Sequence, residues 1–223
     1  EDDLVITPNE SGGPRVEVYE YVSGAFTLTQ NFFALGNPDF RGGARAAVGD
    51  INHDGFGDLI VAAGFGGGPV VEVYNGKSMA QQGQQVVLVP DFFVFDSSLR
   101  NGVYVAAGDV DGDGFADLIV GAGPGGGPRV MVLSGAILTN QGSAAAEAAP
   151  VANFYAGDNS NRDGVGVGVA NLDGDQYADV LTAASASDSQ IMAYLGVDLM
   201  AGVVLPDENF TGFPGLPGGV FVG

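Results

Sequence analysis

The chain has 223 residues and carries 27 acidic against 7 basic side chains, a formal net charge of -20. Such a surface repels phosphate backbones and anionic headgroups, and no apolar run approaches the roughly 20 residues of a membrane span, so we expect no nucleic-acid partner and no membrane insertion. The lack of cysteine excludes disulfides and thiolate metal sites, while a hydrophobic content of 46% indicates a folded domain.

A repeated unit organises the chain. Residues 50–74 (DINHDGFGDLIVAAGFGGGPVVEVY) match residues 109–133 (DVDGDGFADLIVGAGPGGGPRVMVL) without a gap, and residues 171–195 follow the same frame more loosely. Residues 3–19 (DLVITPNESGGPRVEVY) align from Asp117 onward, so the chain begins inside a unit. Three full copies and one split copy indicate a repeat architecture.

Each full unit predicts four strands. One strand precedes the acidic loop, one follows it (LIVAAG in the first full copy), and one follows the glycine turn. The fourth lies at an aromatic landmark that recurs once per unit. The landmarks are Asn31-Phe32-Phe33, Asp91-Phe92-Phe93, Asn153-Phe154-Tyr155 and Asn209-Phe210-Thr211.

Four antiparallel strands in about 60 residues are typical of a propeller blade. We therefore predict an all-β fold, a single four-bladed β-propeller domain over residues 1–223. Residues 218–223 (GGVFVG) match the strand at 101–108 and are expected to complete the first blade, so that the N- and C-terminal strands close it. The expected blades are 1–40 plus 214–223, 41–99, 100–161 and 162–213. The one helix expected is residues 143–149 (SAAAEAA).

The acidic loops are candidate metal sites, because oxygen side chains recur at loop positions 1, 3, 5 and 9. Position 7 is expected to add a backbone carbonyl, and a glycine at position 6 allows the sharp turn in two loops. Hard oxygen donors without cysteine favour Ca²⁺ over zinc or copper. Position 12 holds Val61, Val120 or Thr182 and not the glutamate of an EF-hand, so these are loops of another kind. The predicted ligands are Asp50, Asn52, Asp54, Phe56 and Asp58; Asp109, Asp111, Asp113, Phe115 and Asp117; and Asn171, Asp173, Asp175, Tyr177 and Asp179.

The acidic loop, the following DLIV and the GxGGGPxV turn resemble the FG-GAP or VCBS repeats of integrin-type β-propellers over essentially the whole chain. The resemblance implies that Asp at position 9 closes each calcium site, giving about three Ca²⁺ ions. It also implies a secreted or cell-surface module. Its partner would be a protein or glycan on an extracellular surface, or further copies of the chain. Family members commonly have seven blades, so the four counted here form either a compact ring or an excerpt of a longer array. The matching terminal strands favour the ring.

Catalysis is not expected. The only histidine, His53, lies inside a metal loop and is predicted to face solvent, which leaves no Ser-His-Asp arrangement. The favoured function is a structural or adhesion module. One alternative is a carbohydrate-binding or polysaccharide-degrading propeller, for which Tyr21, Tyr104 and Tyr155 could stack on sugars. The other is a self-assembling filament subunit, in which residues 218–223 pair with a second copy. Asn9 and Asn209 are candidate glycosylation acceptors.

Overall fold

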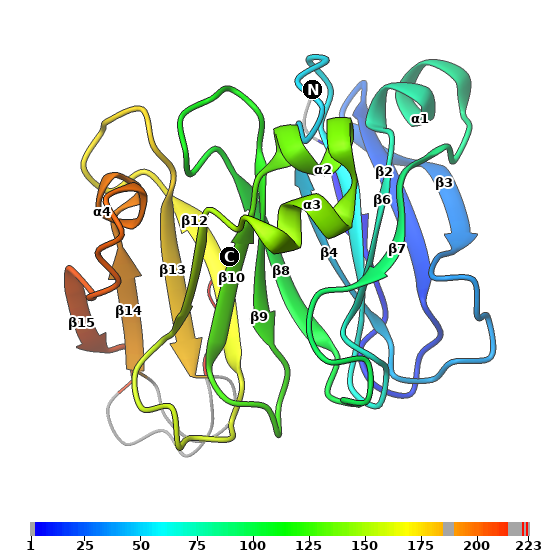
Figure 1. Ribbon diagram of the computed structural model, residues 1–223. Helices are drawn as coiled ribbons and strands as arrows, with labels where there is room; N and C mark the ends of the chain where they lie inside the picture. The colour runs from blue at the N-terminus through cyan, green and yellow to red at the C-terminus, as the bar shows by residue number, and fades with distance from the viewer. Residues whose placement is uncertain (1–2, 185–189, 214–219, 221, 223) are drawn as a thin grey trace.

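A computed structural model describes residues 3–184, 190–213, 220 and 222 and shows four antiparallel sheets along the chain (Figure 1). In every sheet the strands are hydrogen-bonded in chain order. The first sheet contains β1 (Asp3–Ile6), β2 (Arg15–Val22) and β3 (Ala25–Phe33). The second contains β4 (Ala44–Gly49), β5 (Asp58–Ala63), β6 (Val70–Tyr74) and β7 (Val87–Phe93). The third contains β8 (Val103–Gly108), β9 (Asp117–Ala122), β10 (Arg129–Leu133) and β11 (Ala152–Tyr155). The fourth contains β12 (Val165–Ala170), β13 (Asp179–Ala184), β14 (Gln190–Tyr194) and β15 (Glu208–Thr211).

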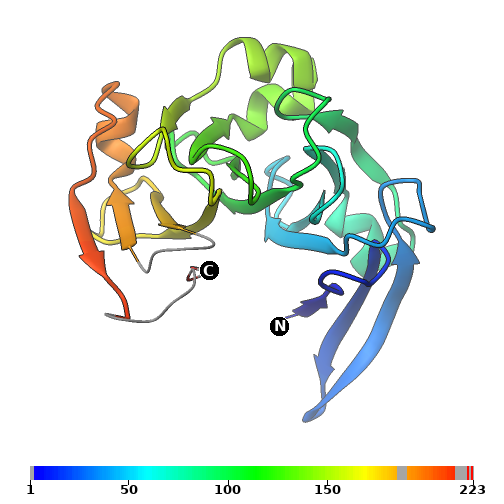
Figure 2. The ribbon, with the colours of Figure 1, turned by 90° about the horizontal axis from the view of Figure 1, so that it is seen from below.

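The sheets follow one another around an open arc (Figure 2). The first strand of each four-stranded sheet lies on the inner side of this arrangement, since β8 contacts β4 on one side and β12 on the other. Every sheet is an up-and-down meander, which short connections can make without crossing. The repeated four-strand unit predicted from the sequence is confirmed in the second, third and fourth sheets.

The hydrophobic core lies between neighbouring sheets. The Leu-Ile-Val run of β5 is fully buried, and its residues alternate between two faces. Leu59 and Val61 pack with Val16 of the first sheet, whereas Ile60 packs with Leu118 of the third. A third cluster joins the third and fourth sheets around Phe154. A strand that is buried on both faces has a continuous apolar sequence, and β5 has such a sequence.

The aromatic landmarks divide between core and surface. Phe92 and Phe154 are buried, and Phe32 packs against the core between the first two sheets. The next residue in each landmark points outward, so Phe33 and Phe93 are exposed. The first aromatic residue of the first three landmarks therefore contributes to the core, whereas Phe210 of the fourth landmark is exposed.

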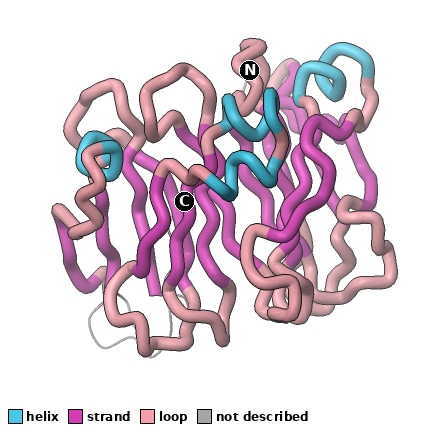
Figure 3. Tube along the Cα trace, in the orientation of Figure 1, coloured by secondary structure: helices cyan, strands magenta, loops and turns pink. Residues whose placement is uncertain are grey.

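In the described part of the chain, four short helices correct the all-β prediction (Figure 3). They follow the third strand of the second, third and fourth sheets, and only the region of α3 was predicted. Asn75 and Ser134 cap the first two by accepting hydrogen bonds from the backbone N–H groups of Ser78 and Ile137, an ordinary N-cap arrangement. The helices are α1 (Gly76–Gln82), α2 (Gly135–Gln141), α3 (Ser143–Ala148) and α4 (Gly196–Met200). Among the described residues, none of these helices has the length and apolar character needed to cross a bilayer.

Closure of the first sheet by residues 218–223 is not seen. Within the described part of the chain, the first sheet has three strands and ends at β1. Most of the predicted C-terminal strand lies outside the described residues. Of the two that are described, Val220 donates its N–H to the Ala184 carbonyl at 3.1 Å. Ala44 makes the equivalent bond to Pro8 at 2.9 Å where the chain passes from the first sheet to β4.

The two ends of the sheets carry different loops. The acidic loops connect the first strand to the second at the end where α1, α2 and α4 lie, toward the top of Figure 1. The glycine turns connect the second strand to the third at the opposite end. The acidic loops of neighbouring sheets therefore lie at one end of the molecule.

Candidate metal centre

Each acidic loop is fixed by the aspartate at its ninth position. Asp117 is fully buried at the start of β9, where its Oδ2 accepts hydrogen bonds from the N–H groups of Val110 (2.9 Å) and Asp111 (3.2 Å). Its Oδ1 accepts the N–H of Gly135 at the start of α2, at 3.1 Å. One carboxylate thus holds the loop against the helix that follows the next strand.

The same arrangement recurs in the other two loops. Their position-9 carboxylates are equally buried and make the equivalent pair of bonds, to a loop N–H and to the first N–H of the following helix. The partners are Ile51 and Gly76 for Asp58, and Leu172 and Gly196 for Asp179.

The earlier aspartates shape the loop itself. Asp109 Oδ1 accepts from the N–H groups of Gly112 (2.7 Å) and Asp113 (3.1 Å), and its Oδ2 accepts from Gly114 (2.9 Å). Asp111 Oδ1 also accepts from Asp113, at 3.1 Å. These short side-chain-to-backbone bonds curl the loop so that its carboxylates converge.

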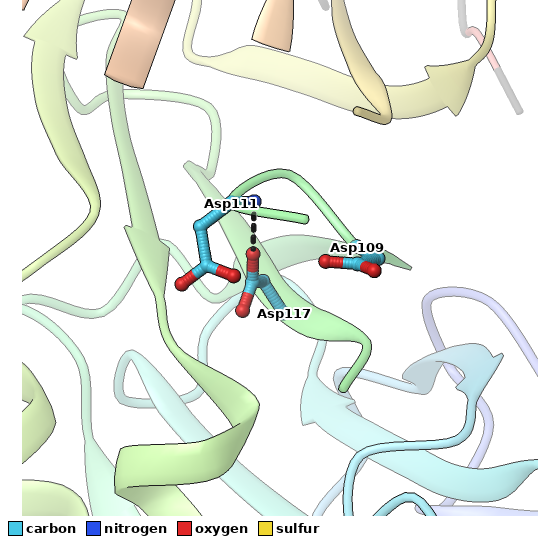
Figure 4. A group of neighbouring side chains, drawn as sticks. All are labelled: Asp109, Asp111 and Asp117. Atoms are coloured by element: carbon cyan, nitrogen blue, oxygen red, sulfur yellow. Dashed lines mark hydrogen bonds between the residues drawn. The ribbon is translucent and has the colours of Figure 1, made fainter. Parts of the chain in front are cut away.

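The convergence is most complete in the 109–117 loop. One carboxylate oxygen each of Asp109, Asp111 and Asp117 lies within 4.8 Å of the others. Figure 4 shows the Asp111 carboxylate beside that of Asp117, the dashed bond from the Asp111 N–H to Asp117, and Asp109 across the loop. Three carboxylates so close repel one another by about a kcal/mol or more per pair at the dielectric of a protein surface. A divalent cation between them would remove that cost.

Burial raises the pKa of Asp117 to about 7, and the nearby charge of Asp111 adds to this effect against three lowering backbone hydrogen bonds. Burial, followed by the charge of Asp113, also raises the pKa of Asp111. In the first loop, burial raises the pKa of Asp58 to about 6. Negative charge is therefore costly at these positions without a bound cation, so the donor set fits a hard cation such as Ca²⁺.

The structure brings together only part of the predicted ligand set. Asp109, Asp111 and Asp117 form the group of three acidic side chains found close enough for one ion within the described ranges. In the other loops an amide takes one ligand position, Asn52 or Asn171, and Asn171 Nδ2 donates to the Asp175 carbonyl at 2.8 Å. The carbonyl ligands predicted at Phe56, Phe115 and Tyr177 stay predictions.

Contacts between neighbouring loops were not anticipated from the sequence. The Ala116 N–H donates to the Asp50 carbonyl at 2.9 Å, and the Ala178 N–H donates to the Asp109 carbonyl at 2.7 Å. These bonds link position 8 of one loop to position 1 of the preceding loop, and only the regular frame of the repeats could have suggested them.

His53, which was predicted to face solvent, also contacts the next acidic loop. His53 is exposed, yet its Nδ1 is hydrogen-bonded to the Gly114 carbonyl of the next loop, and its ring lies 5.2 Å from that of Phe115 between centroids. His53 therefore helps to join the first two acidic loops.

Comparison with known proteins identifies the repeats. The FG-GAP repeat family matches residues 42–78 and 101–143, which include the first two acidic loops. Integrin alpha-7 of Mus musculus is 34% identical over 118 residues, covering 51% of this chain and 10% of that protein. Integrin alpha-V of Gallus gallus is 39% identical over 93 residues, covering 36% of this chain and 8% of that protein. The chain thus spans about a tenth of the length of these relatives.

A solved structure shares the fold. The exotype rhamnogalacturonan lyase YesX superposes on 90% of this chain and 42% of its own, with a TM-score of 0.50 and 16% sequence identity. At this identity the likeness concerns the fold alone. The sequence matches alone show FG-GAP repeats at residues 42–78 and 101–143 and a distant similarity to integrin alpha subunits.

Proposed function

We propose that the chain is a calcium-stabilised, non-catalytic β-propeller module that binds a protein or glycan at an extracellular surface. The observation that carries the proposal is the recurrence of one hydrogen-bond scheme in three acidic loops, with three carboxylates meeting within 4.8 Å in one of them. The homology to integrin alpha subunits supports both the adhesion role and the extracellular location.

The packing of the sheets supports a propeller architecture. Neighbouring sheets bury their apolar faces against each other, and their first strands contact in the order β4, β8, β12. Radial packing of four-stranded meanders is the arrangement of propeller blades. A further strand at the edge of β1 would give the first sheet the same four strands as the rest.

Calcium would act on stability and not on chemistry. The unfolded chain cannot hold carboxylates in the loop geometry, so an ion that binds only the folded chain stabilises it by mass action. Three bound Ca²⁺ ions would also reduce the formal charge from -20 to about -14, easing the repulsion between acidic loops.

A melting experiment tests this role. Extracellular calcium modules bind with dissociation constants of about 10⁻⁴ to 10⁻³ M, so roughly 10 mM calcium should add about 1 to 3 kcal/mol per site to the free energy of unfolding. We expect a clear rise of the melting temperature over that in excess chelator. An unchanged midpoint would contradict the proposal.

A paired substitution locates the effect. Asp111→Asn keeps the Oδ1 acceptor for the Asp113 N–H but removes one charge from the cluster, so it should reduce the calcium-dependent rise. Asp39→Asn removes the same charge from an exposed loop at the opposite end and should leave the rise intact. Equal responses of the two variants would place the calcium elsewhere.

A second candidate function is self-assembly, and the open edge of β1 favours it. In the described part of the chain, no strand is hydrogen-bonded to that edge. A strand from a second copy could add there through backbone hydrogen bonds. Sedimentation over a range of protein concentrations would separate this candidate from a monomeric module.

A further inference from the structure

An arginine occupies the same position in three loops at the end of the molecule opposite the acidic loops. Nη1 of Arg100 donates to the carbonyls of Ser97 (2.7 Å) and Leu99 (2.6 Å) in its own loop. Arg41 and Arg162 make the same two bonds, to the carbonyls one and three residues before each. One nitrogen of each guanidinium therefore fixes the side chain in its loop.

The last strands of the second and third sheets, β7 and β11, each place an aromatic ring beside a glycine turn. A Cβ on Gly68 would lie 2.8 Å from Cε1 of Phe93, and one on Gly127 would lie 3.4 Å from Cε1 of Tyr155. The ring leaves no room for a Cβ at Gly68, whereas at Gly127 a Cβ would meet the ring at an ordinary contact distance. Phe93 is nevertheless 48% exposed and Tyr155 is 51% exposed. A large part of each ring is thus open to solvent above a backbone floor.

Two equivalent hollows contain these groups. The first has a volume of about 340 Å³ and lies between the 35–40 loop and Phe93, over the 66–68 turn, with Arg100 at its side. The second has about 310 Å³ and lies between the 95–99 loop and Tyr155, over the 125–127 turn, with Arg162 at its side. The two hollows therefore occupy equivalent positions at successive sheets.

The same arginines are tied to the turns. The Gly66 N–H donates to the Arg100 carbonyl at 3.0 Å, and the Gly125 N–H donates to the Arg162 carbonyl at 2.7 Å. The turn, the arginine and the aromatic ring of each hollow are therefore held relative to one another. Such preorganisation lowers the entropy cost of binding a ligand.

Each hollow also contains an acid. Asp91 lines the first hollow and Asp96 lines the second. The first hollow has one arginine and one acid, whereas the second also contains Arg129, whose guanidinium lies over the Phe95 ring at 5.2 Å. Each site thus combines hydrogen-bond donors, acceptors and an open aromatic face. A pyranose ring presents matching features, because its hydroxyls donate and accept hydrogen bonds and its C–H faces are apolar.

We propose that these two hollows are adjacent subsites for a neutral polysaccharide, with one pyranose unit against Phe93 and another against Tyr155. This inference rests on the proposed role as a non-catalytic binding module and names its ligand class. A strongly anionic polymer is disfavoured because the chain carries a charge of -20 and an acid lines each hollow.

Affinity electrophoresis in native gels tests the subsites. Calcium-loaded protein is run through gels that contain galactomannan, xyloglucan, mixed-linkage β-glucan or dextran, with polygalacturonate as the anionic comparison. We expect retardation by at least one neutral polymer. Phe93→Ala and Tyr155→Ala should each weaken it about tenfold, the order expected for one stacking contact. The double variant should lose more than either single variant, because two linked subsites reinforce each other.

Matched variants separate binding from folding. Phe26→Ala removes an equally exposed ring, 55% open, from the far end of β3 and should leave retardation unchanged. Phe93→Leu and Tyr155→Leu keep an apolar side chain over the glycine but remove the ring, and they should weaken binding while the calcium-dependent melting shift stays. Retardation that the double Leu variant leaves intact, retardation by polygalacturonate alone, or none by any neutral gel would overturn the proposal. The melting shift reports separately on the calcium role.

Discussion

The buried aspartates at position 9 hold the acidic loops in the geometry that calcium binding needs. Asp58, Asp117 and Asp179 are the only acidic side chains below 2% exposure among the described residues, and each satisfies its oxygens with backbone N–H groups from two separate segments. A buried carboxylate that is fully hydrogen-bonded stabilises the loop even before an ion binds. Calcium would then act on a site that is largely formed.

The raised pKa values of Asp58 and Asp117, about 6 and about 7, predict how calcium and protons compete. The unfolded chain keeps its ordinary carboxyl pKa near 4, so between about pH 4 and pH 7 the calcium-free folded chain binds more protons than the unfolded chain. Its free energy of unfolding therefore falls as the pH rises through that range. Calcium binds the ionised carboxylates, so its contribution grows over the same range.

We accordingly expect the difference in melting temperature between calcium-loaded and calcium-depleted protein to widen from pH 5 to pH 8. Differential scanning calorimetry at several pH values measures it. In Asp111→Asn the widening should be smaller, since that site binds calcium less well. A difference that stays constant, or narrows as the pH rises, would show that Asp117 does not exchange its proton for the ion.

At the scale of elements, the strands could be predicted from the sequence because the repeat fixes their positions in each unit. The DLIV runs become fully buried strands and the glycine turns join them, as the pattern predicts. The candidate site was predicted only in part, since Asp109, Asp111 and Asp117 of the predicted ligands converge in the described residues and the other predicted ligands stay predictions. The spacing of the aspartates, repeated from unit to unit, indicates which residues lie in the same loop.

The helices were not readable in the same way. Helices of five to seven residues are too short to show a clear apolar periodicity. Side-chain caps are present on α1 and α2 but not on α3 and α4. The first N–H groups of α1, α2 and α4 bind the position-9 aspartates. The signals present were local: a capping Asn75 or Ser134 before the helix and Gly83 or Gly142 after it. The hydrogen bonds between loops and the hollows lined by arginine, glycine and an aromatic ring depend on how neighbouring sheets pack. The amino-acid sequence alone does not show that packing.

Two glycines at the ends of α1 allow a matched prediction. A Cβ on Gly76 would lie 1.8 Å from the Gly57 carbonyl oxygen, so Gly76→Ala must push the helix off the first acidic loop and should cost about 3 kcal/mol or more. Gly83 has a φ of 65° but open space around it, so Gly83→Ala should cost only about 1 to 2 kcal/mol.

Urea unfolding of both variants in calcium measures the difference. Gly76→Ala should also reduce the calcium-dependent stabilisation, because the Gly76 N–H binds Asp58 Oδ1 at 2.9 Å. Gly83→Ala should leave the calcium response unchanged. Equal losses of stability would mean that α1 does not press on the loop as the structure shows.

At the scale of the whole molecule, charge is unevenly distributed between the two ends of the sheets. The metal loops place their aspartates at one end, whereas Arg41, Arg100 and Arg162 lie at the other. One ion pair, between Arg15 and Glu17 at 2.7 Å, is found between side chains of the described residues. Most acidic side chains therefore have no cationic partner, and their mutual repulsion opposes folding.

This balance predicts an unusual response to salt. Because few attractive pairs exist to be weakened, screening by NaCl should mainly reduce repulsion among the acidic loops. In chelator, the melting temperature should rise as NaCl increases from about 10 mM to about 150 mM, over which the Debye length shortens from about 30 Å to about 8 Å. With calcium bound, part of the repulsion is already neutralised, so the same increase in salt should raise the midpoint less. Scanning calorimetry of the two forms at matched pH gives both slopes. A midpoint that falls with salt in chelator, or equal slopes for the two forms, would mean that repulsion between the loops is not what calcium relieves.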